Sequence, residues 1–258
     1  MHLPPQSSEQ LDTLPASTKA TLATPLQIQP INIRALGSFC LAFLLFFTLA
    51  CSEMEKAYVE EKNGFLAVEA ENYHSQELDQ LRKWYRIDKH TRLDSLRDVD
   101  DSHAATASGN RYLEILPDTR SNHDEPLIPG ENFSNQAGQL AILNYQVYIN
   151  NPGKYYVWVR AYSTGTEDNG IHVGLDGQWV ASGQRMQWCE GKNQWTWESK
   201  QRTQEVHCGV DEQIYLEIAE VGVHTISFSM REDGFEFDAW IIEKAYQKPD
   251  GLASFSSQ

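Results

Sequence analysis

The sequence predicts an all-β domain, and three observations lead to this fold class. Short apolar segments recur at close intervals between residues 111 and 243. Turn sequences separate them, including Asn150-Asn151-Pro152-Gly153 and the hairpin pair Asp176-Gly177. No stretch with helical periodicity lies between them. Together these observations predict a β-sandwich or a barrel.

Seven strands are expected in this part of the chain. They span residues 111–116, 140–149, 154–163, 171–175, 213–219, 223–230 and 235–243. The first of them alternates, with Tyr112 and Glu114 on one face and apolar residues on the other. Residues 74–110 and 117–136 are less regular, and we expect both to be long loops over the sandwich.

Two short acidic motifs stand at the ends of the domain, in residues 65–73 and 233–242. Glu69 and Glu71 share one strand face, as do Glu236 and Asp238. If the first and last strands meet, their carboxylates could bind a Ca²⁺ ion, which prefers hard oxygen ligands. The alternative is that these are solvated charges that protect an edge strand from pairing.

These two motifs, together with residues 150–160, resemble carbohydrate-binding modules of families 6 and 35. The resemblance covers roughly residues 65–246 and rests on several short motifs in order. It implies a jelly-roll β-sandwich of two antiparallel sheets with long loop insertions, which binds sugars through its loops. It also implies a structural Ca²⁺, with Glu69, Glu71 and Asp238 at the ligand positions.

The N-terminal region differs from the rest in composition. Residues 1–34 are rich in Pro, Ser, Thr and Gln, which predicts a disordered segment or one that precedes the true start. Arg34 then flanks an apolar run that ends at Cys51. We expect residues 35–51 to be a signal peptide with a lipobox and Cys51 to carry a lipid. An uncleaved anchor or a buried helix is the alternative.

This arrangement resembles a bacterial lipoprotein, and the acidic residues after Cys51 resemble Bacteroidetes surface-export signals. We therefore expect an outer-membrane or cell-surface lipoprotein, or a secreted protein. Residues 52–64 are expected to be a linker, residues 65–247 the carbohydrate-binding sandwich, and residues 248–258 a flexible tail.

Cysteine usage agrees with export. Cys40 lies in the signal segment and Cys51 in the lipobox, which leaves Cys189 and Cys208. We expect these two to form a disulfide in an oxidising compartment. A zinc site is a poorer interpretation because the usual paired ligand spacing is missing.

Residues 185–202 are the predicted sugar site. Sugar recognition needs an aromatic plane for the C–H face of a pyranose, with polar groups for its hydroxyls. This segment is a basic, tryptophan-rich stretch in an acidic chain. The predicted binding residues are Trp188, Trp195, Trp197, Arg185 and Lys192. Trp188 is expected to be exposed, whereas Trp195 and Trp197 could instead be core residues. Trp179, after the hairpin turn, could also be exposed.

Charge and motifs narrow the function class. A net charge of −15 argues against nucleic acid, which requires a basic face. The sequence shows no metalloprotease histidine motif and no nucleophile elbow. We therefore expect a non-catalytic protein that binds a polysaccharide at the bacterial surface, near glycan-degrading enzymes or transporters. Algal and plant cell-wall glycans are candidates. A polysaccharide lyase or glycoside hydrolase is the first alternative, and a protein-binding adhesion module is the second.

Overall fold

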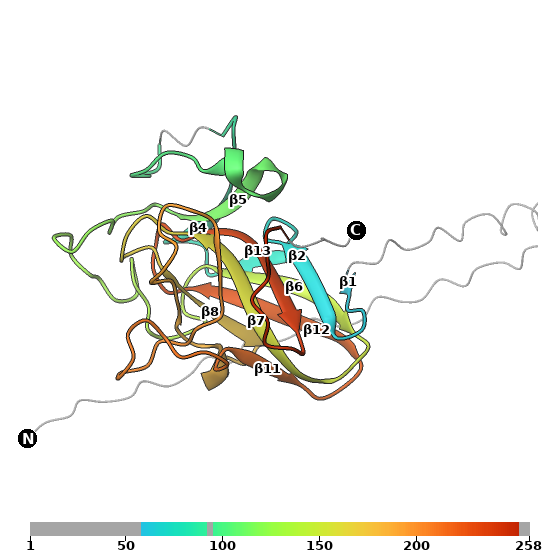
Figure 1. Ribbon diagram of the computed structural model, residues 1–258. Coiled ribbons are helices and arrows are strands. Elements are labelled where there is room, and N and C mark those ends of the chain that lie inside the picture. The colour runs from blue at the N-terminus through green and yellow to red at the C-terminus, as the bar shows by residue number, and fades with distance from the viewer. Residues whose placement is uncertain (1–57, 92–94, 253–258) are drawn as a thin grey trace, which may run out of the picture. The chain divides into compact units, whose positions relative to one another are not determined.

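Two β-sheets packed against each other form the fold (Figure 1). The computed structural model describes residues 58–91 and 95–252. Within these ranges the regular elements are strands and three short 3₁₀ turns, at Ala104–Thr106, Ser108–Asn110 and Ala181–Gly183. This confirms the predicted all-β sandwich. No helix in the described part of the chain is long and apolar enough to cross a membrane.

The first sheet has six strands in the order β1-β6-β12-β8-β9, with β3 also paired to β6. Its strands are β1 (Val59–Glu60), β3 (Ser75–Glu77), β6 (Ile142–Ile149), β8 (Gly170–Leu175), β9 (Met186–Gln187) and β12 (Gly222–Met230). All pairs are antiparallel except β1 with β6.

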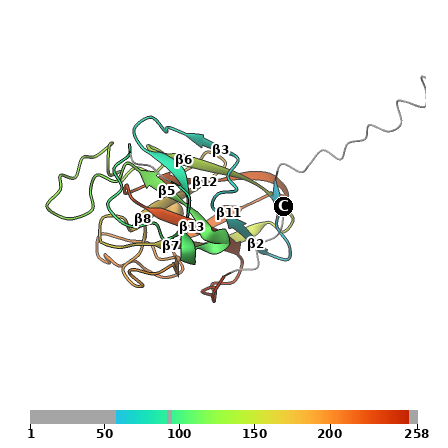
Figure 2. The ribbon, with the colours of Figure 1, turned by 90° about the horizontal axis from the view of Figure 1, so that it is seen from above.

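The second sheet has seven strands in the order β10-β7-β13-β5-β4, with β11 paired to β7 and β2 to β13. Its strands are β2 (Phe65–Glu69), β4 (Lys83–Asp88), β5 (Arg111–Leu116), β7 (Gly153–Tyr162), β10 (Thr196–Glu198), β11 (Tyr215–Ile218) and β13 (Glu236–Glu243). Figure 2 separates the two layers, with β3, β6 and β12 in one and β2, β7 and β13 in the other.

Alternating side chains build the core between the sheets. In β6, Leu143, Tyr145 and Val147 are buried inward, and the residues between them face outward. Aromatic rings fill the centre, where Phe228 contacts both Phe237 and Trp240. The inner face of each sheet therefore packs in the core, and the two outer faces lie outside it.

The outer face of the seven-stranded sheet carries a second apolar layer. One cluster there consists of Ala67, Trp158, Trp197, Ala239 and Ile241. A further cluster lies under the connection between β4 and β5, whose 3₁₀ turns stand above β5 in Figure 1. This outer face is therefore largely covered.

Two segments differ from their predictions. Residues 74–110 were expected to be loop, yet they contain β3 and β4. Trp84 of β4 is buried and donates its indole N–H to the Ala141 carbonyl, so tertiary packing fixes a strand that lacks clear alternation. The expected linker at 52–64 contains β1, and Glu61 beside it accepts hydrogen bonds from Asn150 and Asn151.

Candidate functional site

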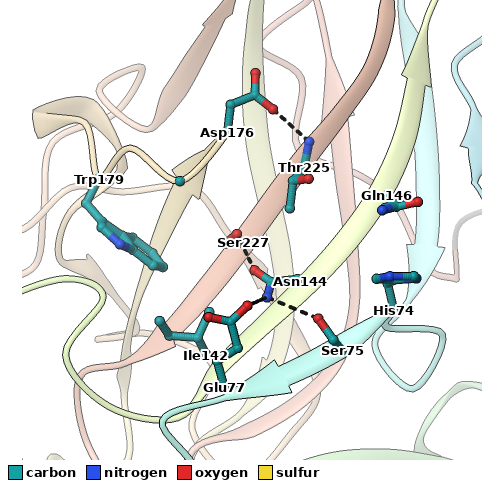
Figure 3. A pocket seen from close by; sticks show the side chains of 11 residues that line it. His74, Ser75, Glu77, Ile142, Asn144, Gln146, Asp176, Trp179, Thr225 and Ser227 are labelled. Carbon is teal, nitrogen blue, oxygen red and sulfur yellow. Dashed lines mark hydrogen bonds between the residues drawn. The ribbon is translucent and has the colours of Figure 1, made fainter. Parts of the chain in front are cut away.

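A polar groove of about 410 Å³ lies on the outer face of the six-stranded sheet (Figure 3). Its floor is formed by β6 and β12, which contribute Ile142, Asn144, Gln146, Thr225 and Ser227. The segment around β3 supplies one side, and the hairpin turn after β8 supplies the other. The remaining lining residues are His74, Ser75, Glu77, Asp176, Gly177 and Trp179.

Trp179 stands at one side of this groove, and local backbone geometry places it there. Asp176 and Gly177 both have positive φ, and Leu175 and Gln178 exchange backbone hydrogen bonds across them. This is the tight hairpin turn that the sequence predicts. It returns the chain so that the indole ring lies over Gly174, where a Cβ atom would come within 2.8 Å of the ring.

A second glycine completes the seat of this ring. A Cβ atom on Gly138 would lie 1.9 Å from the Trp179 indole nitrogen, so no larger residue fits beneath the ring as it stands. Trp179 is partly exposed, and no other aromatic ring of the described residues packs against it. Its seat therefore orients a tryptophan face beside the polar floor.

Polar side chains along the groove fall into two groups. Asn144 is fully engaged, since it donates to Ser75 and Glu77 at 3.2 and 2.7 Å and accepts from Ser227 at 2.7 Å. The side chains of Gln146 and His74 make no hydrogen bond to any residue in the described ranges. Figure 3 shows these two opposite Trp179. The groove thus offers free donors and acceptors facing an aromatic ring.

The predicted sugar residues lie elsewhere. Trp188 was expected to be exposed, and this is wrong, because its side chain is only 1% exposed in the core between the sheets. It packs edge-on against Phe235 at 5.2 Å and donates its indole N–H to the Thr196 carbonyl. Trp197 is 4% exposed and bonds the Gly251 carbonyl. As placed, neither ring offers a face to a sugar.

Trp195 is half-buried on the covered face. Tyr112 and Tyr162 pack against its ring, the Arg160 guanidinium lies 5.6 Å from the ring centre, and its N–H contacts the His103 carbonyl. The partly exposed Arg185 and Lys192 do not line the groove. Arg185 donates its backbone N–H to His172, whereas Lys192 donates to the Ser163 hydroxyl at 2.5 Å.

The disulfide prediction is confirmed. Cys189 and Cys208 are bonded, with their Cα atoms 5.4 Å apart and a sequence separation of 19. Cys51 lies outside the described residues, so the lipidation prediction has no structural counterpart here.

A second pocket lies among the loops at one end of the sandwich and is richer in charge. Arg120, Arg202, Arg231, His123 and His207 line it, together with Glu167 and Glu232. Arg120 pairs with Glu167, and Arg231 pairs with Glu232, so two of the three guanidinium groups are already neutralised. This pocket offers a smaller positive charge than its arginine content suggests.

The predicted calcium ligands Glu69, Glu71 and Asp238 lie near one another where β2 pairs with β13, and the Ca²⁺ itself stays a prediction. Glu69 accepts from the Ser108 hydroxyl at 2.6 Å, and Asp238, at a bulge in β13, accepts from the Ser108 backbone N–H at 2.8 Å. Burial raises the pKa of Glu69 to about 7, and the nearby charges of Glu71 and Asp238 contribute to this rise. These three carboxylates come from β2, from the turn just after it and from β13.

Their free oxygens decide how well a Ca²⁺ ion fits. Glu69 Oε2 and Glu71 Oε2 are buried without a hydrogen-bond partner, which suits a cation. Asp238 has no free carboxylate oxygen, because it also pairs with Arg160. One oxygen each of Glu69 and Glu71 is thus free for a cation, whereas Asp238 and the other oxygen of Glu71 already pair with Arg160 and Arg111.

Another acidic cluster lies on the covered face and was not predicted. Glu114 in β5 and Glu236 in β13 are paired across the sheet and are 1% and 2% exposed. The β4–β5 connection brings Asp98, Asp100 and His103 onto them. Burial raises the pKa of both glutamates well above the ordinary value, and burial beside Asp98 raises that of Asp100 to about 7.

One sequence signal could have indicated this cluster. Residues 98–103 hold three aspartates and a histidine within six positions. The partners Glu114 and Glu236 are far along the chain, however, and only the folded connection brings them together.

The fold defines a β-sandwich domain with an open polar groove on one outer face. Residues 102–253 match the model of the glycosyl hydrolase family 115 C-terminal domain. This chain therefore belongs to that domain family, which connects it with carbohydrate.

A curated relative agrees in sequence over much of the domain. It is an uncharacterized protein, P23, of Formosa agariphila, 55% identical over 183 residues. The match covers 71% of this chain and 44% of the relative, so this chain spans less than half of that protein's length.

Two solved structures show a distant likeness. A family 35 carbohydrate-binding module from Clostridium thermocellum is 14% identical, with 70% of this chain and 98% of the module covered and a TM-score of 0.37. A Podospora anserina mannanase that carries such a module is 11% identical, with 73% and 29% covered and a TM-score of 0.39. The family assignment rests on the sequence match and not on these structures.

Proposed function

We propose that this protein binds a polysaccharide without cleaving it, through the groove beside Trp179. The observation that carries the proposal is the indole ring seated on Gly138 and Gly174 at the side of a polar trough. A pyranose could stack its C–H face on this ring. Its hydroxyls would then reach the unpaired groups of Gln146 and His74.

The charge of the groove favours one class of sugar. Its lining contains the acidic residues Glu77 and Asp176 and no lysine or arginine. A glycan rich in carboxylate or sulfate groups would meet like charge there. We therefore propose neutral, hydroxyl-rich sugars as the ligand class.

The test is affinity electrophoresis of the full chain against a panel of plant and algal polysaccharides. At least one neutral glycan should retard the protein, and Trp179→Ala should remove the retardation. Trp195→Ala is the matched control, because it removes a partly exposed tryptophan from the covered face and should bind as the unmodified protein does. Retardation that survives Trp179→Ala would refute the assignment of the groove.

We also propose export with a lipid anchor at Cys51. The Cys189–Cys208 disulfide supports this, since such bonds persist mainly outside the cytosol. A Cys51→Ala protein should leave the membrane fraction and appear in the soluble fraction. Unchanged membrane association would count against the lipid anchor.

A structural Ca²⁺ held by Glu69 and Glu71 is part of the proposal. The two unpartnered buried oxygens support it, and the ion would offset the repulsion between these carboxylates. Because a ligand that binds only the folded state stabilises it, EDTA should lower the melting temperature of the protein. If neither EDTA nor added Ca²⁺ changed the melting temperature, the result would argue against the calcium site.

An enzyme remains the second candidate because of one contact. His103 Nδ1 lies 2.7 Å from Glu236 Oε1, an arrangement that could serve general acid–base chemistry. New reducing ends or unsaturated products from the retained glycan would favour this candidate, provided that His103→Ala abolishes them.

A further inference from the structure

The acidic cluster on the covered face has the composition and geometry of a metal site. Ligand atoms of Asp100, His103 and Glu236 all lie within 4.8 Å of one another, as do those of Asp98, Asp100 and Glu114. Asp100 belongs to both triads. We propose that Asp100, His103 and Glu236 bind a divalent transition-metal ion, with Asp98 and Glu114 as neighbouring ligands.

An unpaired buried oxygen points to the ion independently of the acidic composition. Glu236 is 2% exposed, and its Oε2 atom is buried without any hydrogen-bond partner. Buried polar atoms nearly always have a hydrogen-bond partner, so a buried carboxylate oxygen without one indicates a position where a ligand could bind. This oxygen belongs to a member of the triad, where a cation would satisfy it.

The protein supplies little positive charge to this cluster. Among the ion pairs of residues 58–91 and 95–252, Glu236 pairs with His103, and Glu114 has no lysine or arginine partner. By contrast, Arg111 pairs with Glu71, and Arg160 pairs with Asp238 at the predicted calcium site. Two cross-strand carboxylates without a lysine or arginine partner are costly to bury as anions.

The donor set favours a transition metal over Ca²⁺ or Mg²⁺. Carboxylates suit Mn²⁺, and imidazole suits Zn²⁺ and its neighbours, whereas Ca²⁺ and Mg²⁺ take oxygen ligands. The His103 ring is held in place, since it stacks on Tyr162 with 3.6 Å between ring centres. Its Nδ1 atom is thereby directed at Glu236.

The ion would fasten a loop to a sheet. Asp98, Asp100 and His103 belong to the β4–β5 connection, whereas Glu114 and Glu236 belong to β5 and β13. Asp98 is exposed, and Asp100 is partly exposed, so an ion can enter from solvent. The ion would thus hold the connection over the outer face of the seven-stranded sheet.

The experiment uses the full chain, stripped with EDTA and then placed in excess Ca²⁺ to saturate any oxygen-only site. Mn²⁺ is titrated in, and free Mn²⁺ is followed by electron paramagnetic resonance; Zn²⁺ is then added as competitor. We expect one equivalent of Mn²⁺ to bind at pH 7 and Zn²⁺ to displace it. The melting temperature should rise by roughly 5 °C at saturating metal.

Two variants and a control locate the ion. Glu236→Gln keeps the shape of the side chain and His103→Ala changes a partly exposed residue, and each should weaken Mn²⁺ binding at least tenfold. Glu71→Gln lies in the other acidic group and should bind Mn²⁺ as the unmodified protein does. Circular dichroism checks that each variant is folded.

Three results would overturn the proposal. They are a failure of the unmodified protein to bind Mn²⁺ or Zn²⁺, unchanged Mn²⁺ binding in folded Glu236→Gln and His103→Ala, and loss of the ion in Glu71→Gln. The last would place the ion at Glu69 and Glu71 instead.

Discussion

The two outer faces of the sandwich carry similar residue types with opposite consequences. On the six-stranded sheet, Trp179 borders an open trough, and its ring meets no other aromatic group of the described chain. On the seven-stranded sheet, Trp195 is held by Tyr112, Tyr162 and Arg160 beneath the β4–β5 connection. What covers a face, and not how many aromatic residues it has, therefore decides whether it can take a ligand.

The same contrast applies to the acids. Glu77 on the open face is exposed to solvent and accepts a hydrogen bond from Asn144. Glu114 and Glu236 on the covered face are buried, and burial raises their pKa values. Covering a face therefore converts ordinary surface acids into groups that need protons or a cation.

The largest expected effect separates the interior from the open face. Trp188→Ala removes a ring buried between the sheets and should lower the free energy of unfolding by about 4 kcal/mol. Trp179→Ala should lower it by only about 1 kcal/mol, because that ring is partly exposed. Urea denaturation of both variants measures the difference. Equal losses would mean that Trp179 is a packing residue and that the groove is not an open face.

The next largest effect on stability is expected from the disulfide in the segment between β9 and β11. Replacing Cys189 and Cys208 together by Ser should cost about 3 kcal/mol, since the bond closes a loop with a sequence separation of 19. Glycan retention should persist, because neither cysteine lines the groove. If a folded double variant were no longer retained by the glycan, the binding site would have to include residues 185–202, the sugar site that the sequence predicts.

The stability of the fold should depend on pH because of one buried histidine beneath the outer surface of the six-stranded sheet. His172 of β8 is fully buried; its Nε2 atom bonds the Ser134 carbonyl, and its Nδ1 atom accepts from the Arg185 N–H. The Nδ1 contact requires the neutral ring, because a protonated Nδ1 cannot accept a hydrogen bond. Burial lowers the pKa from 6.5 to about 4. Between these values the unfolded chain binds a proton that the folded chain does not.

His172 therefore stabilises the fold fully above pH 6.5, and this contribution falls by up to about 3 kcal/mol as the pH drops to 4. Denaturation midpoints measured across that range should decline less steeply in His172→Gln. If the midpoints of the unmodified protein and of His172→Gln declined equally with pH, the His172 ring would be accessible to solvent and not buried.

The sequence predicted the fold well where strands alternate. The segments that became β5, β6, β7, β8, β12 and β13 were all expected within a few residues of their bounds. Strand β4 was missed because the burial of Trp84 depends on Ala141, which is far along the chain. Local pattern cannot report such a contact.

The site was predicted less well, for a physical reason. Trp188 stands among polar residues, which suggested exposure, but its position directly after β9 turns it into the core against Phe235. Trp179 was noted only as a residue that could be exposed, since its glycine seat includes Gly138 from a distant loop. Strands β2 and β13, which carry Glu69 and Asp238, do pair, whereas the Ca²⁺ site built from Glu69, Glu71 and Asp238 stays a prediction.

Calorimetric titration with an oligosaccharide from a retained glycan decides whether the groove beside Trp179 is the sugar site. The unmodified protein, Trp179→Ala and Trp195→Ala would be compared under the same conditions. Loss of a central stacking ring should weaken binding at least about 30-fold in Trp179→Ala, or about 2 kcal/mol, and leave Trp195→Ala unchanged. Weaker binding in Trp195→Ala with full affinity in Trp179→Ala would move the site to the covered face and contradict the account.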